Sequence, residues 1–391
     1  YLLMSNKHGD GPLFSEFPPT PKEKWIEQVS IDLKGADFTK KLVWRTHEES
    51  SIDPFYTSED TAHLEYLKGF HNLNLNQTNP QTVNRSWILY EKVKVGDEKA
   101  ANKESQRAFH MGSNGVNFII DENRMPDLEL LMKNIYPNIN PVKFTVQENP
   151  GTMLKQYMEI IDKNPDLELK DIMGGFDYDP LMHYTLSGNL NEEGIETLAI
   201  VLGSTKDIED FNALTVNGVH FHNSGANAAQ EIALVISAAV EYIERLGSMG
   251  ISLKDFLSGL EFSLAVGTNY FMEIAKIRAL RVLFYNVLQA YEVKDLNPRD
   301  ILIHCESSVW TKTIYDPYVN MLRNTTEAMS AILGGCNSLS ISAFDDIFSQ
   351  PTEFSKRISR NISNLLREES HFDKVSDPAA GSYYIEELTD K

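Results

Sequence analysis

The stretch Asn212-Ala-Leu-Thr-Val-Asn-Gly-Val-His-Phe-His-Asn-Ser-Gly-Ala-Asn227 decides the fold class of this chain, together with the helical pattern that follows it. Residues 214–221 are rich in β-branched and apolar side chains, as in a strand buried on both faces, and Asn223-Ser224-Gly225 interrupts them. From Ala226 to Leu246, apolar residues recur every three or four positions, which predicts an amphipathic helix. In α/β folds built from such strand-helix units, the site lies where the strand ends. We therefore expect functional residues between Val219 and Asn223.

Eight segments have the composition of buried strands, and this count favours a closed α/β architecture, the (β/α)8 TIM barrel. Amphipathic helical patterns fill most of the gaps, although the gap between the third and fourth segments is poor in helical pattern. An open, doubly wound sheet is the alternative, but it would require a glycine-rich phosphate turn after an early strand, and the sequence has none. The segments are residues 116–120, 142–146, 169–173, 197–202, 214–218, 262–266, 301–305 and 338–341.

The barrel pattern begins at residue 87, so we expect residues 1–86 to form an N-terminal arm and surface extension and residues 87–391 to form the barrel. Thr20-Pro21-Lys22-Glu23 predicts the start of a helix, with Thr20 as its N-cap and proline at the first helical position. Residues 57–85 are rich in Asn, Gln and Thr and show no sustained period. This composition is typical of a surface segment, and we expect the segment to lie against a partner.

Composition excludes several functional classes. The formal net charge of −20 argues against nucleic acid or an anionic membrane as a partner. The two cysteines, Cys305 and Cys336, lie in apolar runs without Cys-x-x-Cys or zinc spacing, which indicates buried thiols in a reducing compartment. No apolar run has the length of a membrane span and no secretion signal opens the chain, so we expect a cytoplasmic protein.

Five blocks of sequence follow one another over most of the chain: residues 212–241, residues 271–278, residues 323–329 with Gly334-Gly335 and Ser338-Leu339, residues 360–370, and residues 377–384. In composition and order they resemble the substrate barrel of adenosylcobalamin-dependent methylmalonyl-CoA mutases. The resemblance implies a (β/α)8 barrel followed by a separate cobalamin-binding domain, which we expect to lie beyond Lys391. The N-terminal arm, with Trp25 and Trp44, is more similar to the small (β) subunit of the two-subunit bacterial enzymes than to the large one.

The resemblance also implies where catalytic residues of the family should stand, and most of these positions differ here. A serine cannot replace the two parallel hydrogen bonds that an arginine gives to a substrate carboxylate, and valine or threonine supplies neither the wall nor the phenol of a tyrosine. Losing such groups typically lowers the rate on the order of a hundredfold or more. We therefore predict a degenerate, inactive site. Thr82 and Val219 stand where tyrosines are expected, Asp177 where a glutamine is expected, Ser187 where an arginine is expected and Ser340 where a histidine is expected, while His220 keeps the family residue.

The resemblance predicts the small, non-catalytic subunit of a heterodimeric methylmalonyl-CoA mutase, an isomerase whose homologous large catalytic subunit interconverts methylmalonyl-CoA and succinyl-CoA. It implies adenosylcobalamin in the assembled enzyme. We expect no cobalamin on this chain, because none of its ten histidines has an aspartate two residues before it, as the family motif Asp-x-His-x-x-Gly requires. Whether acyl-CoA still enters the barrel stays open.

Two alternatives remain at this point. A catalytic acyl-CoA mutase with an altered acyl pocket would need a usable side chain at Val219 and Ser187, which the sequence lacks. An unrelated TIM-barrel hydrolase or lyase would use His220-Phe-His222 as a metal-binding pair, since alternate strand residues share a face. No further ligands stand at other strand ends, so we predict no metal site. His304 and Glu306, at the end of the seventh predicted strand, are expected only to line the pocket.

Overall fold

The computed structural model describes residue 17, residues 20–69 and residues 86–391, apart from residues 122–123, 149, 294–295 and 297. The chain divides into two compact units, residues 1–63 and residues 64–391. Thr82, one of the predicted site positions, lies outside the described residues.

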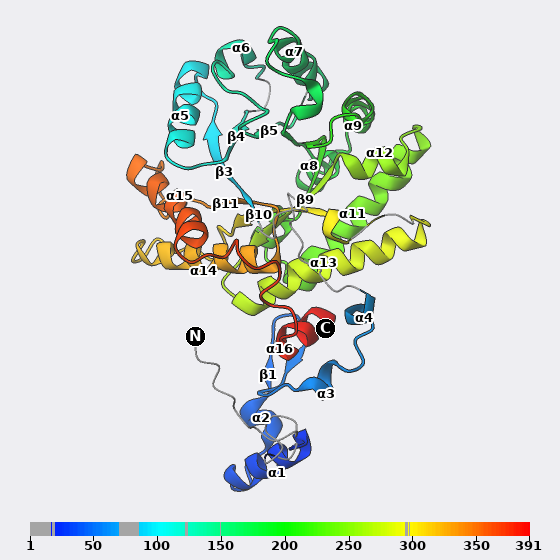
Figure 1. The fold of residues 1–391 in the computed structure, drawn as a ribbon, viewed down its shortest axis with the longest axis vertical. Coiled ribbons are helices and arrows are strands. Elements are labelled where there is room, and N and C mark those ends of the chain that lie inside the picture. The colour runs from blue at the N-terminus through cyan, green and yellow to red at the C-terminus, as the bar shows by residue number, and fades with distance from the viewer. Residues whose placement is uncertain are drawn as a thin grey trace, which may run out of the picture. The chain divides into compact units, whose positions relative to one another are not determined.

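The larger unit is a barrel of parallel strands. Nine strands form one sheet in the order β7-β6-β5-β4-β3-β11-β10-β9-β8, and helices encircle it (Figure 1). Only Ala213 separates β7 from β8, so the two ends of the sheet meet at one interrupted strand and the barrel counts eight. The predicted (β/α)8 fold is confirmed. The strands are β3 (Ile88–Lys94), β4 (Gly115–Ile119), β5 (Val142–Thr145), β6 (Gly174–Asp177), β7 (Phe211–Asn212), β8 (Leu214–Asn217), β9 (Leu260–Val266), β10 (Leu302–Ser307) and β11 (Ser338–Ser340).

The helices cover the outer face of the sheet because the strands direct their apolar side chains outward. Phe118, Phe144 and Phe262 are completely buried in this layer. The helices of the larger unit are α4 (Tyr66–Gly69), α5 (Glu98–His110), α6 (Leu128–Leu131), α7 (Pro150–Asp162), α8 (Pro180–Ser187), α9 (Glu192–Thr205), α10 (Val219–Asn223), α11 (Ala228–Ser248), α12 (Leu253–Ser258), α13 (Tyr270–Ala290), α14 (Val319–Gly334), α15 (Glu353–Glu368) and α16 (Tyr383–Asp390), with short 3-10 turns at Leu169–Asp171 and Pro298–Asp300.

The predicted count of eight strands was right, although one predicted strand is part of a helix and one strand was missed. Residues 197–202 belong to α9, which begins where the Asn191 side chain accepts a hydrogen bond from the Gly194 amide. Their apolar run fits a buried helix face as well as a buried strand, and periodicity alone does not separate the two. The first strand, β3, was missed because polar residues interrupt its apolar pattern.

The third strand begins later than predicted, at Gly174 rather than Leu169. Gly174 and Gly175 have φ angles of 133° and 145°. A Cβ atom on Gly174 would lie 1.8 Å from the Val142 carbonyl oxygen, and one on Gly175 would lie 2.0 Å from the Asn212 carbonyl oxygen. Both positions therefore require glycine, because β6 runs closer to its neighbours than a side chain allows.

The smaller unit contains α1 (Lys22–Asp32), α2 (Phe38–Leu42), α3 (Ser58–Thr61) and an antiparallel pair of short strands, β1 (Trp44–Arg45) and β2 (Ser51–Ile52). The N-cap of α1 is Pro21 rather than the predicted Thr20, and no side chain caps the helix. Trp25 stacks on Phe55, with ring centroids 4.8 Å apart. None of the residues of α1 is buried.

The carboxyl-terminal segment packs on α13. Ser382 is the N-cap of its helix, α16. Arg278 of α13 is buried and its two terminal nitrogens lie 2.6 Å from Asp377 and 2.7 Å from Glu386. Within the described residues, no helix is both long enough and apolar enough to cross a bilayer.

Candidate functional site

The inside of the barrel is polar, which is unusual for this fold. Side chains alternate between the two faces of a strand, and in most (β/α)8 barrels bulky branched residues fill the interior. Here hydrogen bonds and ion pairs join strands that are not neighbours, so they cross the interior, which we call the lumen. Lys143 of β5 contacts Glu261 of β9, and Lys92 of β3 contacts Glu306 of β10.

The pair Lys143–Glu261 crosses the lumen near the amino-terminal ends of β5 and β9. The two residues are only 3% and 2% exposed. The Lys143 ammonium lies 4.8 Å from the centre of the Tyr90 ring, and Ser338 donates a hydrogen bond of 3.4 Å to Glu261. Burial, followed by the charge of Glu261, raises the pKa of Tyr90 well above its ordinary value, so the phenol stays neutral. Lys143 and Ser338 thus both donate to Glu261 inside the lumen.

A second polar chain continues from this pair to the mouth of the lumen. His304 Nδ1 lies 2.7 Å from the Ser338 hydroxyl, and His304 Nε2 lies 3.6 Å from Glu306. Lys92 donates to Glu306 at 2.5 Å. Burial acts to raise the pKa of Glu306, but Lys92 and His304 outweigh it and hold that pKa well below the usual range of a glutamate. Glu306 is therefore an ionised partner of Lys92.

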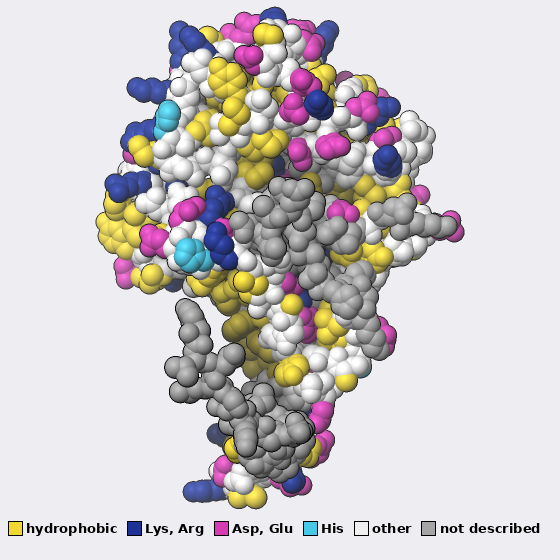
Figure 2. Space-filling model, in the orientation of Figure 1, with side chains coloured by type: hydrophobic (Ala, Val, Ile, Leu, Met, Phe, Trp, Pro, Cys, Tyr) yellow, Lys and Arg dark blue, Asp and Glu magenta, His cyan; other side chains and the backbone are white. Residues whose placement is uncertain are grey.

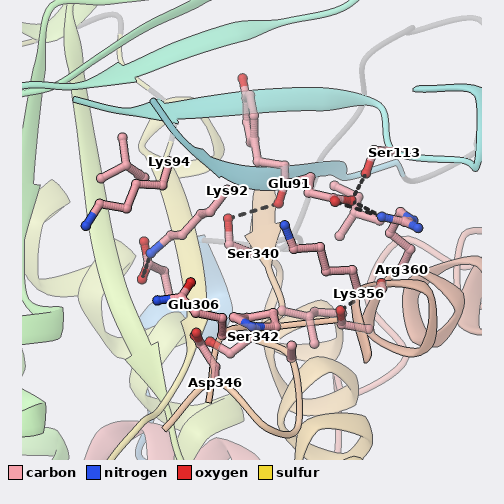
Figure 3. A pocket seen from close by; sticks show the side chains of 18 residues that line it. Glu91, Lys92, Lys94, Ser113, Glu306, Ser340, Ser342, Asp346, Lys356 and Arg360 are labelled. Atoms are coloured by element: carbon pink, nitrogen blue, oxygen red, sulfur yellow. Dashed lines mark hydrogen bonds and ion pairs between the residues drawn. The ribbon is translucent and has the colours of Figure 1, made fainter. Parts of the chain in front are cut away.

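A pocket of about 350 Å³ opens at this mouth, between β3, β10, β11 and α15 (Figure 3). It exists because the barrel wall parts here: β11 pairs with β3 only at Ile88 and Leu89, and from Tyr90 to Lys94 β3 pairs with β4 alone. The pocket consequently reaches both faces of β3. Glu91, which points outward, and Lys92, which points inward, both line it.

Each cation of the pocket already has a carboxylate partner. Arg360 Nη1 lies 2.7 Å from both oxygens of Glu91, which is a two-point contact. Lys356 pairs with Glu104 of α5. Lys94, at the rim, lies 3.6 Å from Asp121. A substrate carboxylate would have to compete with these partners for the cations.

The residues between Val219 and Asn223, which the sequence predicted to be functional, do not form one site in the structure. The strand ends at Asn217, and Val219 to Asn223 form the short helix α10. His220 is exposed, whereas His222 Nε2 lies 2.9 Å from the Ser308 hydroxyl. The two histidines therefore do not share a strand face, and the described residues contain no group of three or more His, Cys, Asp or Glu side chains able to hold a metal ion.

The other predicted positions are dispersed. Asp177 lies in the lumen, where its carboxylate accepts a hydrogen bond of 3.0 Å from Thr145 and one of 3.5 Å from Asn217. Ser340 lines the mouth pocket and donates to the Tyr90 carbonyl at 3.2 Å. Ser187 is exposed at the end of α8.

Sequence reasoning missed the residues that dominate the lumen. Tyr90, Lys92 and Lys94 alternate along β3 with outward-facing residues, and a count of polar residues at period two would have found the strand and its inner face. Lys276 of α13 is also buried, with its ammonium 2.7 Å from Glu231 and 2.6 Å from Glu273.

The surface shows no preference for anionic partners. On the described part of the face in Figure 2, Lys and Arg side chains are interspersed with Asp and Glu rather than gathered into one continuous patch. This distribution agrees with the net charge of −20.

Comparison with known proteins places these features in a family. The family model described as methylmalonyl-CoA mutase matches residues 122–391, more than half of the chain. The methylmalonyl-CoA mutase small subunit of Porphyromonas gingivalis is 34% identical over 381 residues, which cover 96% of this chain and 62% of that protein. The small subunit of Streptomyces virginiae is 27% identical, with coverage of 97% and 62%.

The Porphyromonas gingivalis large subunit is also similar, at 27% identity, with coverage of 92% of this chain and 56% of the relative. The chain thus spans about three fifths of the length of the small subunits that it matches. By the extent of the family match, this chain belongs to the methylmalonyl-CoA mutase family.

Proposed function

We propose that this chain is the small, non-catalytic subunit of a heterodimeric, adenosylcobalamin-dependent methylmalonyl-CoA mutase. In this proposal the homologous large subunit interconverts methylmalonyl-CoA and succinyl-CoA, and the present barrel stabilises it. The observation that carries the proposal is the buried Lys143–Glu261 pair across the lumen. The two small-subunit relatives support it.

The buried Lys143–Glu261 pair argues against a substrate deep inside this barrel. Lys143 and Glu261 are a buried pair, and removing one member of such a pair typically costs about 3–5 kcal/mol because the other charge is left without compensation. A ligand that reached this depth of the lumen would have to separate them. Its own polar groups would then have to replace both partners, as well as the bond from Ser338.

The mouth of the barrel also lacks the groups that the family chemistry needs. Val219 offers neither a phenol nor a bulky aromatic wall, and the exposed hydroxyl of Ser187 cannot bind a carboxylate at two points as an arginine does. The remaining cations of the pocket are engaged with Glu306, Glu91 and other carboxylates. These features support a barrel that binds no acyl group for reaction.

The described residues do not fit a histidine-ligated cobalamin. Bound adenosylcobalamin would supply the radical chemistry of the assembled enzyme. The two partly or fully buried histidines of the candidate site are already held: His222 by Ser308 and His304 by Ser338. Neither stands in an Asp-x-His-x-x-Gly sequence. We assign the cofactor to the large subunit.

The smaller unit supports the role of a docking partner. Its helix α1 has no buried residue, and apolar side chains remain exposed on the unit, with Ile31 69%, Trp44 50% and Phe55 38% exposed. Exposed aromatic and aliphatic groups in one small unit are typical of a surface that another protein covers. Porphyromonas gingivalis has both a small and a large subunit similar to this chain, which makes a homologous large subunit the natural partner.

The test is co-purification of the full-length protein with the large subunit from the same organism, followed by mutase assays with adenosylcobalamin. We expect a stable complex and turnover by the large subunit or by the pair, with none from this chain alone. Turnover by this chain alone would favour the alternative of a catalytic mutase with an altered acyl pocket. Separation of the two chains during purification would contradict the docking role.

A further inference from the structure

One carboxylate of the mouth pocket has no ion-pair partner among the described residues. Asp346 lines the pocket, on the side away from Arg360 (Figure 3), and its side chain forms no hydrogen bond or ion pair with another described residue. The four cations that line the pocket, by contrast, are each paired with a carboxylate. The charge left unpaired at the mouth is therefore negative. The pairs are Lys92–Glu306, Lys94–Asp121, Lys356–Glu104 and Arg360–Glu91.

A further carboxylate acts on the same side of the mouth. Asp177, in the lumen, accepts its hydrogen bonds from a threonine and an asparagine, which are neutral. Burial acts to lower the pKa of Lys92, but the Glu306 carboxylate acts to raise it. The charges of Asp177 and Asp346 add to this effect, and the pKa of Lys92 lies above its ordinary value. One ammonium group thus serves three carboxylates.

The segment that carries Asp346 is fixed in place by neighbouring elements. Asn324 of α14 donates to the Ser342 carbonyl at 2.8 Å, and the Ser342 amide donates to the Ser307 hydroxyl at the end of β10, also at 2.8 Å. The Asp346 amide donates to the Ala343 carbonyl at 3.2 Å. These bonds hold the backbone of the segment before a ligand arrives, which lowers the cost of binding.

The rest of the pocket suits a small molecule with polar and apolar parts. The Ser342 hydroxyl and the Gln350 amide line it, and neither side chain forms a hydrogen bond with another described residue. Ile341, Ala343 and Pro351 supply apolar lining. At about 350 Å³, the pocket lies at the small end of the range of ligand sites.

We propose that the mouth pocket binds a small organic cation, a primary amine that carries a hydroxyl group, rather than a carboxylic acid. The ammonium group donates to the Asp346 carboxylate, and the hydroxyl group pairs with Ser342 or Gln350. Because the described residues contain no group of three or more His, Cys, Asp or Glu side chains able to hold a metal ion, an organic ammonium ion is the cation that fits. This inference concerns the chain by itself and does not depend on the proposed subunit role.

Three probes of similar size test the sign of the charge: ethanolamine is a cation, ethylene glycol is neutral and glycolate is an anion. Each is titrated into the full-length protein near neutral pH, and saturation-transfer NMR gives its dissociation constant. We expect saturable binding of ethanolamine, with the other two probes about tenfold weaker or more, because neither offers an ammonium group to the unpaired carboxylate. If glycolate binds as tightly as ethanolamine, or if ethanolamine does not saturate, the proposal is wrong.

Asp346→Asn removes the charge of the site and nearly keeps the size of the side chain. It should weaken ethanolamine binding about tenfold or more. Asp207→Asn, which removes an exposed aspartate in the turn after α9, is the matched control and should bind ethanolamine as the unchanged protein does. Unaltered affinity in Asp346→Asn, or an equal loss in the control, contradicts the site. The comparison of the three probes does not depend on the folding of either variant, and the co-purification test of the subunit role is a separate measurement.

Discussion

At the scale of single residues, the Lys143–Glu261 pair makes the strongest prediction about stability. Lys143→Ala should lower the free energy of unfolding by about 3–5 kcal/mol, because Glu261 would remain charged and buried without its partner. Urea denaturation followed by circular dichroism measures the change. Lys163→Ala is the control, since Lys163 pairs with Glu129 on the surface at a similar contact distance, with both side chains about two thirds exposed. Equal losses in the two variants would show that the lumen pair has no special role.

The lowered pKa of Glu306 predicts how the stability of the fold depends on pH. Its pKa is lower in the folded protein than in the unfolded chain, so the stabilisation that it provides is present above the unfolded value, about 4.3, and is lost as pH falls below it. The unchanged protein should therefore lose stability more steeply below about pH 5 than the variant Glu306→Gln. Urea denaturation of both proteins between neutral and acidic pH measures the two slopes. Parallel slopes would mean that Glu306 is not held in its ionised form by Lys92.

Single residues also show what the sequence could and could not predict about the site. The differences at Asp177 and Ser340 were visible from the sequence, because a resemblance compares positions one by one. The pair Lys143–Glu261 was not, because its members are 118 residues apart and only closure of the barrel brings them together. His220 and His222 were placed on a strand because their neighbours are apolar, whereas the strand ends at Asn217.

At the scale of elements, β6 shows how a short strand depends on its glycines. Gly175→Ala should prevent the barrel from closing correctly, because the new Cβ would meet the Asn212 backbone, where nothing can move aside cheaply. We expect loss of the cooperative thermal transition. Gly203→Ala, at an exposed position in the last turn of α9 with open space around it, should instead stabilise the protein by up to about 1 kcal/mol. A normal transition in Gly175→Ala would refute the close approach of β6 to β7.

Elements also explain why the fold class was easier to predict than its parts. A long helix such as α11 repeats its apolar spacing often enough to be recognised, and the pattern from Ala226 to Leu246 predicted it close to its observed bounds, Ala228–Ser248. Short buried segments such as residues 197–202 are apolar on every side, and only their neighbours decide between helix and strand. The polar lumen added a second difficulty, since it removed the apolar signature from β3.

At the scale of the whole molecule, the question is which part of the chain joins it to a partner. Most apolar side chains of the barrel unit are buried in one continuous core, while the smaller unit leaves Ile26, Ile31 and Trp44 at least 37% exposed. This chain has a net charge of −20. It would therefore associate with a homologous partner more readily through an uncharged apolar surface than through its charged faces.

We therefore predict that Ile26→Asp combined with Ile31→Asp on α1 weakens binding to the large subunit at least tenfold without changing the thermal stability of the barrel. Each new carboxylate would have to lose its hydration in the interface, a cost that α1 alone does not bear, because none of its residues is buried. Binding is measured by surface plasmon resonance with the purified large subunit. Ile139→Asp, at a position on the barrel unit that is 68% exposed, is the matched control and should bind normally. If the control weakens binding and the α1 variant does not, the barrel carries the interface and the smaller unit has another role.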